Sequence, residues 1–165
     1  MTTVKIIAMA GSLREGSYNK LLAKIAAEAA RKAGADVNYI DLKEYPMPIY
    51  DQDDEDKNGL PENAKKLKEL FMQSHGLIIA SPEYNSSISA VLKNTIDWLS
   101  RQAGDAKALA AFDGKVAGLL SASPSGFGGV RGLSSLRSIL GNIKVTVLPD
   151  QVTVCLLYTS DAADE

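Results

Sequence analysis

The sequence contains a single cysteine and a single histidine, and both scarcities exclude kinds of chemistry. With Cys155 alone there is no disulfide framework and no cysteine cluster that could bind a metal. A lone His75 excludes metal sites and catalytic schemes that need two histidines, and its place just before an apolar stretch favours a structural role. The sequence therefore predicts a protein without a metal.

An excess of basic residues and long apolar runs are also missing. The chain has 18 Lys and Arg against 20 Asp and Glu, a net charge of −2, so neither nucleic acid nor an anionic membrane is expected as a partner. No apolar run approaches the length that spans a bilayer. Residues 1–3 lead directly into an apolar stretch and leave no room for a signal peptide. We expect a cytoplasmic protein of one domain, the size that 165 residues allow.

Short apolar runs alternate with segments of helical periodicity along the chain. The pattern predicts strands at 4–10, 35–42, 76–81, 116–121 and 144–148, and helices at 20–30, 61–73, 90–100 and 130–140. Ser89 stands where the 90–100 helix needs an N-cap. Two prolines exclude a regular element over 45–50, and the acidic run 51–56 is expected to be a solvated loop. Such alternation is typical of an α/β domain, a parallel sheet with helices on both faces.

The stretch Gly11–Asn19 joins the first strand to the first helix and has the composition of an anion site. The unpaired N–H groups and the dipole of a helix N-terminus favour negative charge. Ser12, Ser17 and Asn19 add side-chain donors, and Arg14 adds a positive charge. The loop therefore predicts a phosphate site; the alternative is a surface loop with capping serines.

Two familiar phosphate motifs are excluded here. Gly11 and Gly16 have the spacing of a P-loop, but Ser17 stands where that motif needs a lysine. Leu13 occupies the second glycine position of a Rossmann turn. A hydroxyl-rich cup closed by one arginine remains, and such a cup suits one terminal phosphate.

Two further polar loops, 82–87 and 122–129, follow the third and fourth strands. Ligands of open α/β sheets bind beyond the carboxyl ends of the strands, where the strand order reverses. In the order 2-1-3-4-5 the first and third strands are neighbours whose loops flank that point. The three loops together predict a site for a flat ring tethered to a phosphate. For 82–87 alone, an ordinary strand-to-helix turn is the alternative.

Two of these stretches together resemble the NAD(P)H-dependent FMN reductase family, whose flavodoxin-like members include quinone, chromate and azo-dye reductases. The first is Gly11-Ser12-Leu13-Arg14 with Ser17 and Asn19. The second is Ser81-Pro82-Glu83-Tyr84-Asn85 with the run 92–101, Leu-Lys-Asn-Thr-Ile-Asp-Trp-Leu-Ser-Arg. The resemblance covers residues 4 to about 154. It implies a flavodoxin-like three-layer sandwich with a five-stranded parallel sheet in the order 2-1-3-4-5.

The resemblance also implies a cofactor and its ligands. Ser12, Arg14, Ser17 and Asn19 would hold the FMN phosphate. Pro82, Glu83, Tyr84 and Asn85 would run along the isoalloxazine, with Ser123 and Gly126 approaching from the loop after the fourth strand. NADPH or NADH would supply electrons for quinones, free flavin or similar small acceptors. No catalytic residue is assigned, because the flavin carries the chemistry; Tyr84 and Asn85 are the best-placed candidates.

The resemblance further implies a homodimer or homotetramer, with the Asp97-Trp98 helix near the subunit interface. The alternative is a flavodoxin-like electron carrier that serves a protein partner. Such carriers are typically strongly acidic, and a net charge of −2 favours the enzyme.

The last residues depart from the family pattern. Residues 155–165 resemble foreign sequence more than a family C-terminus, so we predict a flavin-binding domain over 1–154 and an atypical tail over 155–165. Beyond about Tyr158 the tail is too poor in apolar residues for an amphipathic helix. We expect it to be extended or disordered, leaving apolar surface of the sheet or first helix uncovered.

Overall fold

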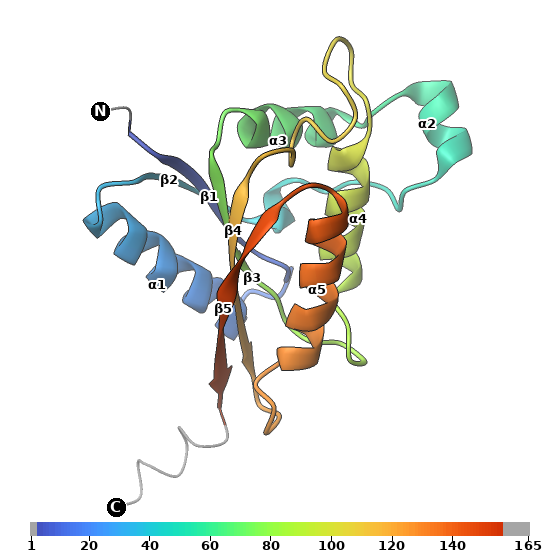
Figure 1. Cartoon of the computed structure of the whole chain (residues 1–165). Helices are drawn as coiled ribbons and strands as arrows, with labels where there is room; N and C mark the ends of the chain where they lie inside the picture. Colours follow the sequence, from blue (N-terminus) through green and yellow to red (C-terminus); the bar gives the residue numbers. More distant parts are fainter. Residues whose placement is uncertain (1–2, 157–165) are drawn as a thin grey trace, which may run out of the picture.

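The computed structural model describes residues 3–156, and its five strands form one parallel sheet in the order β2-β1-β3-β4-β5 (Figure 1). The strands are β1 (Lys5–Ala10), β2 (Asp36–Ile40), β3 (Gly76–Ala80), β4 (Val116–Ser123) and β5 (Thr146–Cys155). The helices are α1 (Tyr18–Lys32), α2 (Gln52–Asn58), α3 (Glu62–Met72), α4 (Ala90–Ser100) and α5 (Val130–Asn142), with a 3-10 turn η1 (Leu42–Glu44) after β2. This arrangement confirms the predicted fold class.

Side chains of alternating size separate the two faces of the sheet. In β1, Ile7 and Met9 belong to the large core beneath α3, α4 and α5. Ala8 and Ala10 face the other way, and α1 packs on them through Ala23 and Ala27. Because successive residues of a strand point to opposite faces, one short run supplies both layers. Figure 1 shows α1 alone on one side of the sheet and the other long helices on the opposite side.

The acidic run expected to be a loop is instead the short helix α2. Asp51 is its N-cap, and the Asp51 carboxylate accepts a hydrogen bond from Asp53 N at 2.8 Å. Acidic residues fill the first turn, where they favour the positive end of the helix dipole. No residue of α2 is buried, so the run is solvated as predicted but helical.

The last strand is longer than the predicted 144–148. Pairing with β4 passes from Ala117–Val147 directly to Leu119–Gln151, so Leu148, Pro149 and Asp150 form a bulge and pairing resumes as far as Cys155. The sheet tolerates the proline because β5 is an edge strand, whose outer side needs no ladder hydrogen bonds. The predicted domain boundary after residue 154 falls inside this strand, and residues 157–165 lie outside the described part of the chain.

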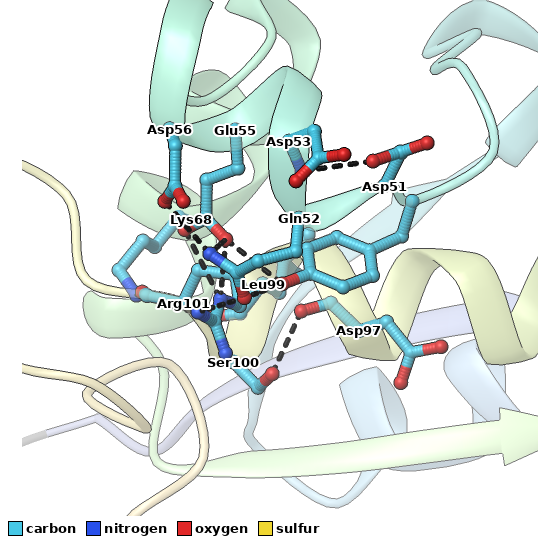
Figure 2. A network of polar contacts seen from close by, with 11 residues as sticks. Asp51, Gln52, Asp53, Glu55, Asp56, Lys68, Asp97, Leu99, Ser100 and Arg101 are labelled. Carbon is cyan, nitrogen blue, oxygen red and sulfur yellow. Dashed lines mark hydrogen bonds and ion pairs between the residues drawn. The ribbon is translucent and has the colours of Figure 1, made fainter.

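The segment 46–51, which we call the strap, is irregular, as its prolines predict, and it lies against α4. Asn94 accepts a hydrogen bond from Tyr50 N and donates one to Pro48 O, both at 2.8 Å. The buried Trp98 donates to the same Pro48 oxygen at 2.9 Å. Beyond the strap, Arg101 pairs with Glu55 at 2.7 Å and contacts Gln52, which holds α2 to the end of α4 (Figure 2).

Residues 3–156 contain neither a membrane-spanning helix nor a metal-binding cluster of side chains. No helix there combines the length and the apolar character needed to cross a bilayer. The same residues hold no group of three or more His, Cys, Asp and Glu side chains placed to bind a metal. His75 binds the first residue of β1: its Nδ1 accepts a hydrogen bond from Lys5 N at 2.9 Å.

Candidate functional site

The loops after β1, β3 and β4 meet at the carboxyl edge of the sheet and enclose a cavity of about 340 Å³. Each loop contributes one wall. The lining residues are Ser12, Arg14, Ser17, Tyr18 and Asn19 from the first loop, Pro82, Glu83 and Tyr84 from the second, and Ala122, Ser123 and Pro124 from the third. The juxtaposition predicted from strand order is therefore present.

The first loop leads into a helix N-terminus that has no cap. Ser17 is the N-cap residue of α1, yet its side chain makes no capping hydrogen bond, and the first turn contains no acidic residue. Ser12 Oγ folds back to accept a hydrogen bond from Arg14 N at 3.3 Å. The amides of this first turn and the Ser17 hydroxyl are thus the donors that an anion in the cavity would meet.

Arg14 supplies the positive charge of the cup. Within residues 3–156 it has no carboxylate partner, and its guanidinium lies 6.0 Å from the centre of the Tyr18 ring. Lys20, in the first turn of α1, is instead bound to Asp41 at 2.7 Å. Burial raises the pKa of Asp41, but hydrogen bonds from the Lys20 ammonium and the Lys43 amide lower the pKa by more, so the carboxylate stays charged. No carboxylate in residues 3–156 therefore neutralises the charge of Arg14, and this charge is available to a ligand.

The other two helices that follow these loops are already capped. At α4, Ser89 Oγ accepts a hydrogen bond from Leu92 N at 3.3 Å and donates one to Gly11 O at 2.6 Å, so the predicted cap also ties this helix to the first loop. At α5, Glu83 Oε2 accepts a hydrogen bond from Gly132 N at 3.0 Å. Among these three helix ends, α1 is the one left for an anion.

Asn19 is engaged within the protein. Its Nδ2 donates to Ala122 O and its Oδ1 accepts from Ala122 N, both at 2.9 Å, which ties the first turn of α1 to the end of β4. The side chain is buried. Both hydrogen bonds of the amide are therefore directed at the β4 backbone.

The second loop contains a tight two-residue turn. Tyr84 and Ser87 exchange two backbone hydrogen bonds, of 2.9 and 3.1 Å, around Asn85 and Ser86. Both central residues have positive φ, 51° and 64°, a conformation that asparagine tolerates and serine rarely adopts. Such strain is concentrated at functional sites. The turn leaves the Tyr84 side chain exposed at the cavity mouth.

The third loop is closed by hydrogen bonds among its own residues. Ser123 Oγ accepts from Ser125 N at 3.2 Å, and Gly128 N donates to Ser125 O at 3.0 Å. Gly128 has a φ of 57°, and a Cβ there would lie 3.0 Å from Thr153 Cβ. The glycine is therefore needed for the turn and for its approach to β5.

Most predicted site residues line the cavity, and two do not. Asn85 lies in the turn behind Tyr84, and Gly126 lies beyond the lining of the third loop. Sequence reasoning missed Tyr18, Ala122 and Pro124. Tyr18 carried a signal, since it follows Ser17 at the start of the helix, whereas Ala122 and Pro124 line the wall through their position in the fold.

A larger cavity of about 650 Å³ lies elsewhere, between α3 and the 102–106 turn. It borders the C-terminal ends of α3 and α4, where the helix dipole is negative and disfavours an anion. The Lys68 ammonium on the wall of this cavity already has protein partners, because Nζ donates to Leu99 O at 3.0 Å and to Arg101 O. The smaller cavity therefore fits the predicted phosphate better.

Comparison with known proteins places this geometry in a family. The model of the family described as NADPH-dependent FMN reductase matches residues 4–156. A quinone reductase of Escherichia coli (strain K12) is 35% identical over 137 residues, which are 83% of this chain and 69% of the relative. A 2-hydroxy-1,4-benzoquinone reductase of Burkholderia sp is 33% identical over 145 residues, 88% of this chain and 74% of the relative.

A solved structure agrees with these sequence matches. The flavoenzyme NAD(P)H:(acceptor) oxidoreductase of Paracoccus denitrificans superposes on this chain with a TM-score of 0.75 at 26% identity. The match covers 90% of this chain and 78% of that protein. The family match over residues 4–156 takes in all three loops of the cavity and the sheet that carries them. The chain belongs to the NADPH-dependent FMN reductase family.

Proposed function

We propose that this protein is an NAD(P)H-dependent oxidoreductase that holds FMN in the cavity of the three loops and passes electrons to quinones, free flavin or similar acceptors. The observation that carries the proposal is the uncapped N-terminus of α1, which opens into this cavity beside Arg14. An uncapped helix end with no acid in its first turn is suited to an anion, and a flavin monophosphate supplies one.

The residues that surround this helix end fit the phosphate of FMN. Arg14, the Ser17 hydroxyl and the first-turn amides would hold it, with Ser12 shaping the turn. Asn19 would act indirectly, because its side chain fixes the start of α1 to Ala122. When bound, FMN supplies hydride acceptance from nicotinamide and electron donation to an acceptor.

The ring of the flavin would lie along the other two loops. Pro82, Glu83 and Tyr84 form one wall and Ser123 forms the facing one. Of these residues, Pro82 has no backbone N–H and the Tyr84 amide already donates to Ser87 O. The backbone N–H of Glu83 is a donor that would stabilise negative charge on the ring. We assign no side chain to acid or base catalysis. Of the two candidates, Tyr84 lines the cavity and Asn85 does not.

Identification of the bound flavin tests the cofactor. Protein purified without added cofactor is expected to be yellow and to release, on heat denaturation, a flavin with the chromatographic mobility of FMN. Release of FAD, or failure to bind FMN on reconstitution, would contradict the proposal.

Steady-state kinetics separate the enzyme from an electron carrier that needs a protein partner. With NADPH or NADH and a simple quinone, the protein is expected to turn over unaided. One site that accepts nicotinamide and quinone in turn gives parallel double-reciprocal lines. Converging lines would require a second pocket, and no turnover with either nucleotide would favour the carrier.

The assembly and location follow from the same proposal. We infer a cytoplasmic homodimer or homotetramer with α4 near the subunit interface, and no nucleic acid partner, which the net charge of −2 supports. Sedimentation velocity of the holoprotein tests the assembly, since a monomer at micromolar concentration would contradict it.

A further inference from the structure

The helix α5 begins at a residue that cannot carry a capping side chain. Gly129 is its N-cap, with φ of 89° and ψ of 18°. A Cβ at this position would lie 2.0 Å from Ser121 Oγ and 2.9 Å from Ser121 Cβ. Neither serine, threonine, aspartate nor asparagine, the usual capping residues, fits there. The free amides at the start of α5 must therefore find an acceptor elsewhere.

The acceptor comes from the loop after β3. Glu83 Oε2 accepts the hydrogen bond of Gly132 N at 3.0 Å, and its negative charge lies at the positive end of the helix. The two backbones are also in close contact, because a Cβ on Gly132 would lie 3.2 Å from both Glu83 Cβ and Ser87 O. The contact joins residues 49 positions apart in the chain.

We propose that Glu83 is a positioning residue: its carboxylate caps α5 and holds the loop after β3 and the loop after β4 in one fixed relation. This inference rests on the proposed function, in which these two loops form the ring side of the flavin site. Glu83 lines the cavity, yet its carboxylate is bonded to the protein rather than free for a ligand. The same contact gives the amides at the start of α5 an acceptor within the protein. The start of α1 has no such side-chain acceptor and is therefore the helix end that can bind the phosphate.

Paired flavin ligands separate this role from phosphate binding. Glu83→Ala is expected to weaken the binding of FMN and of riboflavin by the same factor, about tenfold. Loss of the helix cap would loosen the two loops that line the flavin ring and leave the residues around the phosphate in place. Glu83→Gln keeps an acceptor oxygen for Gly132 N and is expected to bind both flavins within about twofold of wild type. Arg14→Ala is the control, because it should weaken FMN and leave riboflavin unchanged. Flavin fluorescence quenching of the apoproteins measures each dissociation constant.

Amide hydrogen exchange of Gly132, followed by NMR in the flavin-free protein, reports on the cap directly. Exchange is expected to be at least about tenfold faster in Glu83→Ala than in wild type and to be restored in Glu83→Gln. Should Glu83→Ala fail to fold, Glu83→Gln and the milder Glu83→Asp, with a shorter reach to Gly132, replace it.

Three results would overturn the inference: unchanged exchange at Gly132 in Glu83→Ala, loss of affinity for FMN alone, or a Glu83→Gln protein as weak as Glu83→Ala. A wild-type protein that bound neither flavin would contradict the proposed function. The exchange of Gly132 would then still decide whether Glu83 caps α5.

Discussion

Arg14 and Lys20 are both basic residues near the start of α1, and their surroundings give them different tasks. Lys20 is buried and bound to Asp41, whereas Arg14 lies at the cavity with no carboxylate partner in the described chain. The arginine fork also suits a phosphate better than an ammonium does. The charge that a ligand phosphate meets is therefore that of Arg14.

Replacement of Arg14 tests this assignment. A hydrogen bond to a charged group contributes about 1.5–3 kcal/mol, so Arg14→Ala is expected to weaken FMN binding about 10- to 100-fold. Turnover at saturating FMN should change much less, because the phosphate is remote from the reacting ring. Lys24→Ala, which removes a charge from the next turn of α1 outside the cavity, is the matched control. Equal affinities of the Arg14 variant and wild type would place the phosphate elsewhere.

Lys68 gives a prediction on stability and pH. Its ammonium is buried and donates to Leu99 O and Arg101 O at the end of α4, and burial lowers its pKa. Lys68→Met leaves these carbonyls without a partner and should cost about 1–3 kcal/mol in the free energy of unfolding.

The pH dependence of that cost has a definite sign. Because the folded pKa of Lys68 is below the unfolded one, the unfolded state binds more protons between the two values. The contribution of Lys68 therefore increases as pH rises through the folded pKa, and is complete above about 10.4, the unfolded value. Urea unfolding at pH 7 and pH 9.5 should show a larger deficit of Lys68→Met at the higher pH. A deficit that shrinks would contradict the desolvated ammonium.

Among the elements, α4 shows that a sequence motif of the family can also stabilise the fold. The 92–101 run contributes to the family resemblance, yet three of its residues also hold other segments of the chain. Asn94 and Trp98 bind the strap. Arg101 binds α2 through Glu55 (Figure 2). The Tyr50 and Trp98 rings pack in a T-shaped pair, with 5.0 Å between ring centres. The motif therefore serves the fold of one chain, in addition to any interface.

Loss of the two hydrogen bonds between Asn94 and the strap is expected to free the strap from α4. Asn94→Ala removes two hydrogen bonds to the strap backbone and should lower the free energy of unfolding by about 1–3 kcal/mol. Limited proteolysis should cut 46–58 faster. The neighbouring Lys93→Ala, which breaks an exposed i, i+4 ion pair with Asp97, should cost about 0.3–0.5 kcal/mol and leave proteolysis unchanged. Equal effects of the two variants would mean that Asn94 does not anchor the strap.

The regular elements could be predicted where local pattern decides them, as in the Ser89 cap and the apolar run of β1. The failures have a physical reason in each case. The acidic run 51–56 has no apolar periodicity, so its helix depends on the Asp51 cap and on Arg101, which is distant in sequence. The strand β5 continues past Pro149 because only one side of an edge strand must pair.

At the scale of the molecule, strand order brought the three predicted loops together, and this part of the site could be anticipated. The orientation of individual side chains could not. Asn19 bonds to Ala122 and Glu83 to Gly132, over 103 and 49 residues of chain, and no local pattern encodes either contact. Both had been expected to touch the cofactor, and both contribute in the structure to the walls that surround it.

Large apolar side chains are exposed on the outer side of α1 and on the edge strand β5. Leu21 and Ile25 on α1 are 56% and 58% exposed, and Val152 on β5 is 50% exposed. The prediction for the tail beyond Tyr158 lies outside the described residues, so the exposure is stated for residues 3–156. Exposed apolar patches of this kind mark surfaces that bind something or cost solubility.

Polar substitution on α1 decides whether this face is open in solution. Glutamine and leucine have similar helix propensities, so Leu21→Gln with Ile25→Gln should change the free energy of unfolding by no more than about 0.5 kcal/mol if both side chains face water. The control Ala27→Gln forces a large polar group into a fully buried position against Ala8 and Val37 and should cost well over about 1 kcal/mol. A loss above about 2 kcal/mol in the double variant would mean that the face is covered, since burial of apolar area contributes about 25 cal/mol per Å². Repeating the unfolding at several protein concentrations then separates the two possible covers: a second copy makes the loss depend on concentration, and residues of the same chain do not.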